Sequence, residues 1–496
     1  MARQGIYWCA VLALCCGCST PARRYLADRA APPAEVAAVD SSETDEPDET
    51  ESLETETTSP IRTVSSDDSI PYESGPVQLA ATAELSLPVC IATGLAQNPD
   101  LIAARQADNV SSAALGVAQT YPFNPFVQVQ ATPIQDTRFP NSPNTTYHYV
   151  LLMQTIQLAH QQQFREEGAV ATLNSTRWNI HQAELLNVAQ TERLYFTAVY
   201  LHGLLELAEA SHTNNQQMLK TLEKQLEAGQ ATAADVALVR VDTRSTAHQR
   251  RLARANYETA LRDLKRQLGL NVDDPAMIQG DLRNLIWRAP ADVSLEPRSD
   301  DSSLQIPADR EKVLICSHAA SRPDVMAARS DIDVARANLS LATASKTPDL
   351  QIGPYYQRTL DGTTFWGFRA QMDLPVINSG RPLERQRAAE LGQRLTAWQQ
   401  SVRRAELEAQ AAWERYKLAS EAVAEDAEFG NVDLPAEFDQ LEKQFIAGEV
   451  DVIRVMQART SMIQNRRVQL DLLNELAQSA ANVTASTGIS VEQLLR

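Results

Sequence analysis

Aromatic residues and glycine are scarce in this sequence. Aromatics make up 6% of the 496 residues and glycine contributes 18, although hydrophobic residues of all kinds reach 44%. Ala, Leu, Gln, Glu and Arg are abundant instead, and this composition is typical of long helices. It favours a mainly helical protein over one large globular core.

Positive charge is also in short supply. The chain has 45 Lys and Arg against 63 Asp and Glu, a formal net charge of -18. Nucleic-acid binding requires a basic surface, so a nucleic-acid partner is excluded. Part of the acid is local, since Asp40 to Glu56 holds nine acidic residues and no basic one. Residues 18–80 have few large apolar side chains and are predicted to form a disordered acidic tether. Cation binding by the acid run is the alternative.

The apolar stretch Ile6–Leu14 is too short to cross a bilayer. It has the form of an export signal, so residues 1–17 are predicted to be a lipoprotein signal peptide. Cys18 follows Gly17 and is the expected lipidation site, with Cys16 as the alternative. An ordinary cleaved signal peptide is the competing interpretation. Each buried CH₂ of an acyl chain contributes about 0.8 kcal/mol, so several chains would anchor the protein firmly.

Cysteine is nearly absent beyond this signal. Four of the six cysteines lie within the first 18 residues, and only Cys90 and Cys316 remain. Exported proteins can form disulfides, but two distant cysteines can equally be small buried apolar residues. Their pairing stays open at this stage.

Motifs that carry chemistry are missing as well. The sequence has no glycine-rich phosphate loop, no Cys-x-x-Cys after the signal and no paired-His motif. The seven His residues are scattered. We therefore expect no catalytic residue, no metal site and no cofactor, and the chain is not expected to be an enzyme.

An internal repeat organises the rest of the chain. Residues 98–105 read Asn-Pro-Asp-Leu-Ile-Ala-Ala-Arg, and residues 322–329 read Arg-Pro-Asp-Val-Met-Ala-Ala-Arg. Pro sets the first helical turn and Asp favours its positive end, so each motif is predicted to begin a helix. The repeats are assigned to 81–270 and 321–496, joined by a linker at 271–320.

A strand pair is expected after each of these helices. In the first repeat the predicted strands are Phe126–Ala131 and Tyr147–Leu158. In the second they are Leu350–Arg358 and Thr364–Leu374, joined by an Asp-Gly turn. The last strand alternates, which predicts one apolar and one polar face.

That alternation has two interpretations. Trp366, Phe368 and Met372 fall on one face of the strand, whereas Arg369 and Asp373 fall on the other. A half-buried soluble hairpin requires this pattern, and so does a membrane barrel strand. The Trp and Phe favour the barrel, with these three apolar side chains facing lipid.

A very long helix follows each strand pair. The first is expected at Phe164–Glu227, roughly 95 Å long at 1.5 Å per residue, and it ends at a turn containing Gly229. The second is expected at Leu383–Ile446 and ends at a turn containing Gly448. A shorter helix with coiled-coil spacing returns after each turn. Each repeat can then be a coil of one continuous and one interrupted helix.

Four strands per chain cannot close a membrane barrel by themselves. Open sheet edges are not tolerated in lipid, and the smallest barrels have about eight strands. Several copies must therefore share a barrel, and these arguments leave two, three or more copies open.

The order of these motifs resembles the TolC-type outer-membrane efflux protein family over residues 85–489. The twin helix starts, the hairpins and the twin Ala-Gly turns carry the resemblance. Leu374-Pro375 with Gly380-Arg381, and the Leu-Pro-Ala-Glu sequence of 434–437, are similar to the branch that includes CzcC-like metal-efflux ducts.

This resemblance implies a mainly α protein with a membrane β-barrel portion. Three copies would share a twelve-stranded barrel above a long α-helical coiled-coil barrel. The homotrimer would be a passive exit duct of the cell outer membrane, lipid-anchored and extending into the periplasm. A periplasmic adaptor would open it, and an inner-membrane pump of a tripartite efflux or type I secretion system would power it.

The resemblance also assigns roles to the turns. Gly229 and Gly448 would contact the adaptor. The best-known member of the family has acidic rings six and nine residues after the second glycine, but here Arg454 and Gln457 occupy those positions. Asp235 keeps the acid in the first repeat. We expect Asp235 and Arg454 to lie near each other and help to close the aperture; two solvated surface charges are the alternative.

Two other classes of protein compete with a duct. One is a lipid-anchored coiled-coil envelope scaffold, and the other is a periplasmic adaptor without a pore. The scaffold has no use for amphipathic strands, and the adaptor would have one helical hairpin instead of two matched repeats. The cargo stays open between metal ions, drugs and peptides.

Overall fold

The computed structural model describes residues 83–134, 145–271, 273–290, 293, 310–429, 440, 443–444 and 450–495. All of them belong to one compact unit. The expected signal peptide, Cys18, the tether of 18–80 and Gly448 lie outside these residues. Within the described ranges, no helix combines the length and the hydrophobicity needed to cross a membrane.

The first repeat contains the elements that its sequence predicts. Pro99 begins the opening helix, and the Asn98 side chain caps it by accepting a hydrogen bond from the Leu101 N–H at 2.9 Å. The elements are α2 (Pro99–Gln119), β2 (Phe126–Ile134), β3 (Thr145–Ile156), α3 (Gln161–Glu227) and α4 (Ala233–Leu268).

The second repeat has the same order. Its elements are α6 (Pro323–Ala344), β5 (Leu350–Arg358), β6 (Thr364–Met372), α7 (Arg381–Phe429) and α9 (Val452–Thr487). The predicted bounds of β5 are confirmed, whereas β2 is longer than expected and β6 ends before Leu374. Leu374 precedes Pro375, which has no backbone N–H to continue the ladder.

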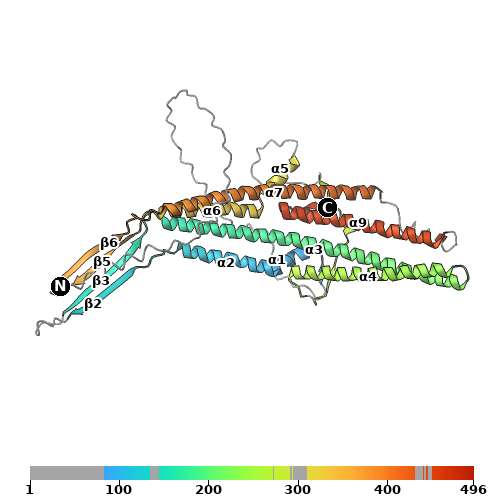
Figure 1. The fold of residues 1–496 in the computed structure, drawn as a ribbon, viewed down its shortest axis with the longest axis horizontal. Helices are drawn as coiled ribbons and strands as arrows, with labels where there is room; N and C mark the ends of the chain where they lie inside the picture. The colour runs from blue at the N-terminus through green and yellow to red at the C-terminus, as the bar shows by residue number, and fades with distance from the viewer. Residues whose placement is uncertain are drawn as a thin grey trace, which may run out of the picture. The chain divides into compact units, whose positions relative to one another are not determined.

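The long helices hold the interrupted ones in place (Figure 1). Helix α3 contacts both α2 and α4, and α7 contacts both α6 and α9. In the first repeat, α2 with 21 residues and α4 with 36 pack along the 67 residues of α3. The predicted pairing of one continuous helix with two shorter ones is therefore confirmed. Contacts of α3 with α6 and α9 join the two repeats.

The main core lies where these helices meet two short elements that the sequence did not indicate. These are α1 (Leu87–Gln97) and α10 (Val491–Leu494). Phe196 of α3, Leu264 of α4 and Tyr416 of α7 are fully buried in this cluster. It is the largest apolar contribution to stability among the described residues.

A glycine allows α4 to end against α1. Gly269 has a φ of +72° and terminates α4 in the left-handed conformation. A Cβ at this position would lie 2.2 Å from the Gln97 carbonyl oxygen. Only glycine fits both the backbone conformation and the close approach.

The predicted linker packs against the C-terminal end of the chain. It contains β4 (Ala276–Ile278), which pairs in parallel with β1 (Ala83–Leu85), and the short helix η2 (Leu282–Asn284). The Arg288 N–H and Nε donate to the carbonyls of Leu494 and Leu495. Helix α5 (Arg310–Ala320), which was not predicted, follows and packs on α7.

The two strand hairpins form one antiparallel sheet in the order β2-β3-β5-β6. Pairing of β3 with β5 joins the hairpin of the first repeat to that of the second, from His148↔Arg358 to Ile156↔Leu350. Strands β2 and β6 each have one neighbour, so both outer edges of the sheet are unpaired among the described residues.

Candidate functional site

The strand register divides the sheet into two chemically different faces. On one face, which we call the apolar face, every strand contributes hydrophobic side chains. Trp366 and Phe368 are each 79% exposed there, and the Trp366 ring contacts Tyr356. The exposed members of the apolar face are Val127, Val129, Val150, Leu152, Ile156, Ile352, Trp366, Phe368 and Met372. An apolar surface continuous over four strands is unusual for a protein in water.

The opposite face, which we call the polar face, carries mostly amide, hydroxyl and phenol groups. Four described side chains are apolar exceptions: Leu151 and Met153 are buried, whereas Phe126 and Phe365 are 58% and 46% exposed. The polar members are Gln128, Gln130, Thr132, Tyr147, Tyr149, Thr155, Gln351, Tyr355, Gln357, Arg369 and Gln371. Apolar-out and polar-in strands are the pattern of a barrel wall around an aqueous lumen.

Two glycines on the polar face make room for close packing. A Cβ at Gly367 would lie 2.7 Å from the Tyr355 ring, which therefore covers this glycine from the neighbouring strand. A Cβ at Gly353 would lie 1.7 Å from the Leu152 carbonyl oxygen. The Tyr355 ring also contacts Tyr149, with centroids 6.0 Å apart. The rings of Tyr149 and Tyr355 thus lie beside each other on the polar face.

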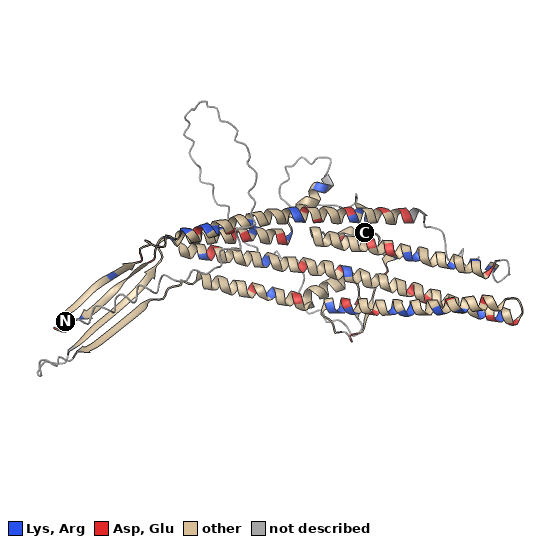
Figure 2. Cartoon of the chain, in the orientation of Figure 1, with Lys and Arg blue, Asp and Glu red and all other residues tan. Residues whose placement is uncertain are grey.

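Charge is nearly absent from the sheet, as Figure 2 shows by contrast with the helices. The four strands contain no Asp or Glu, and their only Lys or Arg residues are Arg358 and Arg369. Arg358 shares the apolar face and lies at the strand end beside the turn. Arg369 shares the polar face, where its guanidinium donates to the Tyr149 hydroxyl and to the Gln371 amide oxygen.

The β5–β6 turn is the predicted Asp-Gly turn. Gly362 has a φ of +87°. The Asp361 carboxylate accepts hydrogen bonds from the Thr359 hydroxyl and from the N–H and hydroxyl of Thr363. These bonds lower the pKa of Asp361, the Thr359 bond contributing most. The turn therefore fixes the register of the hairpin.

A second candidate site surrounds the turn between α3 and α4. Gly229 has a φ of +71°, and a Cβ there would meet nothing within 4 Å, so the turn is open to a partner. Thr232 and Asp235 then form a capping box at the start of α4. A sequence signal for this cap, Thr-x-x-Asp after the turn, was present.

Helix α9 begins at the same end of the unit. Its first residues pack against α3 and α4 in a separate apolar cluster, which we call the tip cluster. The buried members are Met218, Leu222, Val236, Val239, Val452 and Val455. Because Asp235 and Arg454 each adjoin a member of this cluster, both belong to the tip.

The structure gives Asp235 and Arg454 different surroundings. The Asp235 carboxylate accepts a hydrogen bond from the Thr232 hydroxyl at 2.6 Å. Arg454 is exposed in the first turn of α9. Among the described residues no ion pair joins the two within one chain, and their expected proximity stays a prediction.

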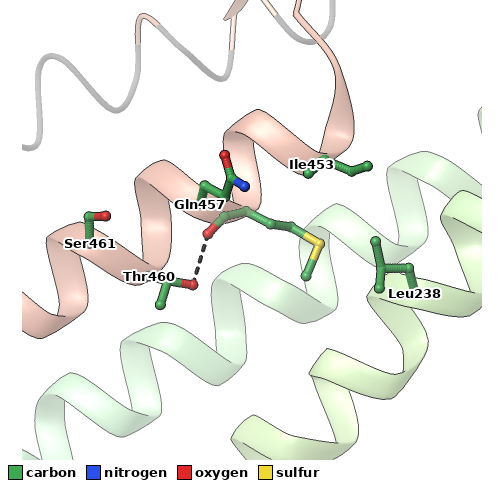
Figure 3. Close-up of a pocket in the computed structure, with 6 residues that line it drawn as sticks. Leu238, Ile453, Gln457, Thr460 and Ser461 are labelled. Carbon is green, nitrogen blue, oxygen red and sulfur yellow. Dashed lines mark hydrogen bonds between the residues drawn. The ribbon is translucent and has the colours of Figure 1, made fainter.

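Gln457, the third predicted aperture residue, lines an open groove between α9 and α4 (Figure 3). Leu238 and Ile453 face it from the two helices and are 44% and 49% exposed. The Thr460 hydroxyl donates to the Met456 carbonyl at 2.9 Å, so it is already engaged. The groove therefore has a mixed lining, with Leu238, Ile453 and Met456 as its apolar part and Gln457, Thr460 and Ser461 as its polar part.

A buried polar layer lies behind the tip cluster and was not predicted. Arg459 of α9 is 8% exposed, and its Nη1 donates to the Asn215 side-chain oxygen at 3.2 Å. The Asn215 amide donates in turn to the Asp242 carboxylate at 2.5 Å. The layer therefore ties α9 to α3 and α4. A signal existed, since Arg459 continues the spacing of the apolar Val452 and Val455.

A buried carboxyl in the main core was also missed. Glu192 of α3 is 1% exposed, and it accepts hydrogen bonds from the Thr484 hydroxyl and the Val491 N–H. Burial is the main cause that raises the pKa of Glu192 to about 8. The carboxyl is therefore mainly protonated at neutral pH.

Cys90 and Cys316 are both free thiols. Cys90 is buried in the main core, and burial raises its pKa to about 12. Within the described ranges, no three His, Cys, Asp or Glu side chains are grouped so that they could hold a metal ion.

Comparison with known proteins identifies the fold. No family model matches the chain, and no curated protein matches it in sequence. Solved structures do match. The outer-membrane channel OprN is 18% identical, with 81% of this chain and 89% of that chain covered at a TM-score of 0.61.

Two further matches agree. CusC, described in connection with transmembrane channel formation, is 17% identical over 83% of this chain and 96% of its own, at a TM-score of 0.61. The CmeC outer-membrane channel of Campylobacter jejuni is 14% identical over 81% and 85%, at 0.63. With more than four fifths of this chain covered in each match, the chain has the fold of these outer-membrane channels.

Proposed function

We propose that this chain is one subunit of an outer-membrane exit duct, the passive conduit of a tripartite efflux or type I secretion system. The observation that carries this proposal is the four-stranded sheet, which has one exposed apolar face, one polar face and two unpaired edges. A scaffold, or an adaptor without a pore, would not require a sheet that combines an exposed apolar face, a polar face and unpaired edges.

Closure of the sheet requires other copies of the chain. In lipid, each unpaired backbone group costs several kcal/mol, so the free edges of β2 and β6 must find partners. The β6 edge of one copy can pair with the β2 edge of the next. Three copies give twelve strands, wide enough to leave an aqueous lumen lined by the polar face. The resemblance to the TolC-type family implies this number, and the fold shared with the channels OprN and CmeC supports a channel.

The remaining parts of the chain follow from this assignment. Acyl chains on Cys18 would anchor the duct to the outer membrane through the acidic tether of 18–80. The turns at Gly229 and Gly448 would meet a periplasmic adaptor, and an inner-membrane pump would supply the energy. The chain itself carries out no reaction in this scheme, and the two repeats at 81–270 and 321–496 build its wall.

The aperture would be closed by contacts between copies at the tip. Asp235, Arg454 and Gln457 lie on helices that share the tip cluster, so a ring of copies brings their side chains around the axis. Reversal of charge by Asp235→Arg should raise the conductance of the resting duct. An unchanged conductance would remove Asp235 from the aperture.

The decisive experiment is single-channel recording of the detergent-extracted protein in a planar bilayer, with its mass measured by native mass spectrometry. Discrete conductance steps from a trimer are expected. A protein that leaves the membrane without detergent once its acyl chains are removed, and that never conducts, would instead support the scaffold. A conducting dimer or tetramer would refute the twelve-stranded barrel but not the duct.

A further inference from the structure

The polar face of the sheet carries a single full charge. Of its side chains, only Arg369 is ionised at neutral pH, and the rest are amides, hydroxyls, phenols and apolar groups. The four strands contribute no carboxylate to either face. Within the four strands the polar face is therefore positive wherever it is charged, and Asp373, which the alternation places on the same face, lies just beyond the end of β6.

The charge of Arg369 is not neutralised within the described part of the chain. Its two hydrogen bonds run to neutral groups, the Tyr149 hydroxyl at 3.5 Å and the Gln371 amide oxygen at 3.4 Å. Both are long for a charged donor, and no salt bridge to another described residue involves Arg369. The guanidinium lies in an exposed position, opposite Gly353 on the neighbouring strand, where no side chain covers it.

We propose that Arg369 is a selectivity-determining residue, which makes the barrel lumen favour negatively charged solutes over cations. This inference rests on the proposed function, because the polar face must line a conducting lumen. In a three-copy barrel the chain's single Arg369 becomes a ring of three positive charges at one level. Rings of Arg or Lys are the usual basis of anion preference in pores.

The tip gives no acidic counterweight at the positions where one was expected. Arg454 and Gln457 stand where the resemblance predicted acidic rings. The Asp235 carboxylate is engaged in the cap of its own helix. At these two positions, therefore, no acidic ring precedes the positive ring of the barrel.

The size of the effect follows from screening. A unit charge acts over about 8 Å at physiological ionic strength and over about 30 Å in 0.01 M salt. We expect the three charges to raise the anion-to-cation permeability ratio by about two- to fivefold in dilute salt, and by much less in 1 M salt.

Arg358 provides a matched control on the same sheet. It lies in β5, but on the apolar face, across from His148 and beside the β5–β6 turn. Arg358→Gln removes the same charge from the chain without altering the lumen. If the two variants differ in permeability ratio, the difference is due to the face on which the charge lies and not to the net charge of the chain.

The test is the reversal potential of single ducts under a tenfold KCl gradient. For Arg369→Gln, the chloride-to-potassium permeability ratio should fall about two- to fivefold relative to the unaltered chain. For Arg369→Lys and Arg358→Gln it should stay near the unaltered value. An unchanged ratio in Arg369→Gln, or an equal change in Arg358→Gln, would overturn the assignment.

A second measurement avoids comparing separately folded variants. Arg369→Cys ducts are recorded before and after a positive or a negative methanethiosulfonate reagent, which adds either charge to the same thiol. Cys90 is buried, and unmodified Arg369 ducts treated identically control for Cys316. The positive reagent should restore anion preference and the negative one should reverse it. Equal results from both reagents would refute a role for charge at this position, whereas a trimer without any conductance would refute the duct itself.

Discussion

The buried Glu192 should make the protein more stable in acid than in base. Its pKa is raised from 4.5 to about 8, chiefly by burial. The unfolded chain binds this proton only below about pH 4.5, whereas the folded chain keeps it up to about pH 8. The folded state binds more protons between these values, so stability is fully present below pH 4.5 and is lost as the pH rises to about 8.

The magnitude follows from the two pKa values. At 1.36 kcal/mol for each pKa unit, the shift corresponds to about 5 kcal/mol per chain above pH 8, and to about 3 kcal/mol at pH 7. Glu192→Gln keeps the shape of the protonated carboxyl and cannot ionise. The variant should therefore match the unaltered protein at pH 4.5 and become more stable than it by these amounts as the pH rises.

The assay is the thermal midpoint of helix loss, followed by circular dichroism in detergent from pH 4.5 to 9. Glu184→Gln is the control with the opposite sign. Burial raises the pKa of Glu184, but hydrogen bonds from His181 and Arg105 outweigh it, so the net pKa is lowered. Glu184→Gln removes this carboxylate, so the variant should be less stable than the unaltered protein above pH 4.5 and equally stable in acid. If the thermal midpoints of Glu192→Gln and the unaltered protein changed with pH in parallel, ionisation of Glu192 would not control stability.

Three further substitutions test the tip, the apolar face and the core. Leu222→Ala removes a buried member of the tip cluster and should cost about 3 kcal/mol, seen as faster amide exchange at the turn; unchanged exchange would contradict the packing. Phe368→Arg places a charge on the apolar face at a cost of about 2–4 kcal/mol per chain and should reduce membrane insertion, measured by flotation. Gln371→Arg, on the polar face, should insert normally, and equal insertion of both would refute the face assignment. Gly269→Ala should lower the thermal midpoint markedly, because its Cβ would lie 2.2 Å from the Gln97 carbonyl; a midpoint within error would refute the close approach.

The local parts of the fold could be predicted because their signals are local. Pro99 and Pro323 each begin a helix at the position that suits proline, and Gly362 marks a tight turn. The alternation of apolar and polar residues along β6 predicted that this strand has one apolar and one polar face. Each of these inferences depends on residues within a few positions of one another.

The pairing of β3 with β5 had no such signal. These strands are far apart in sequence, and nothing in either indicates which strand of the other hairpin lies beside it. Helix α5 was missed for a different reason, since it lies in a segment that was taken as a linker. Non-local pairing requires the arrangement of the helices below the sheet, which the sequence does not state.

Buried charges were the least predictable feature. On a long helix, one Glu among polar neighbours looks the same whether it faces solvent or another helix. Glu192 faces α9 and α10, and Arg459 faces Asn215 of α3. Only the tertiary contacts distinguish these two from the many solvated charges on the same helices.

In the proposed duct, the unpaired edges of β2 and β6 would also set how the number of complete rings depends on the supply of subunits. Because no chain can complete the ring alone, a three-copy assembly rises with the third power of the free subunit concentration. Halving that concentration lowers the number of rings about eightfold while most chains are still single. A subunit with one faulty edge blocks closure of every ring that it enters, so such a mutation acts dominantly over the normal copies.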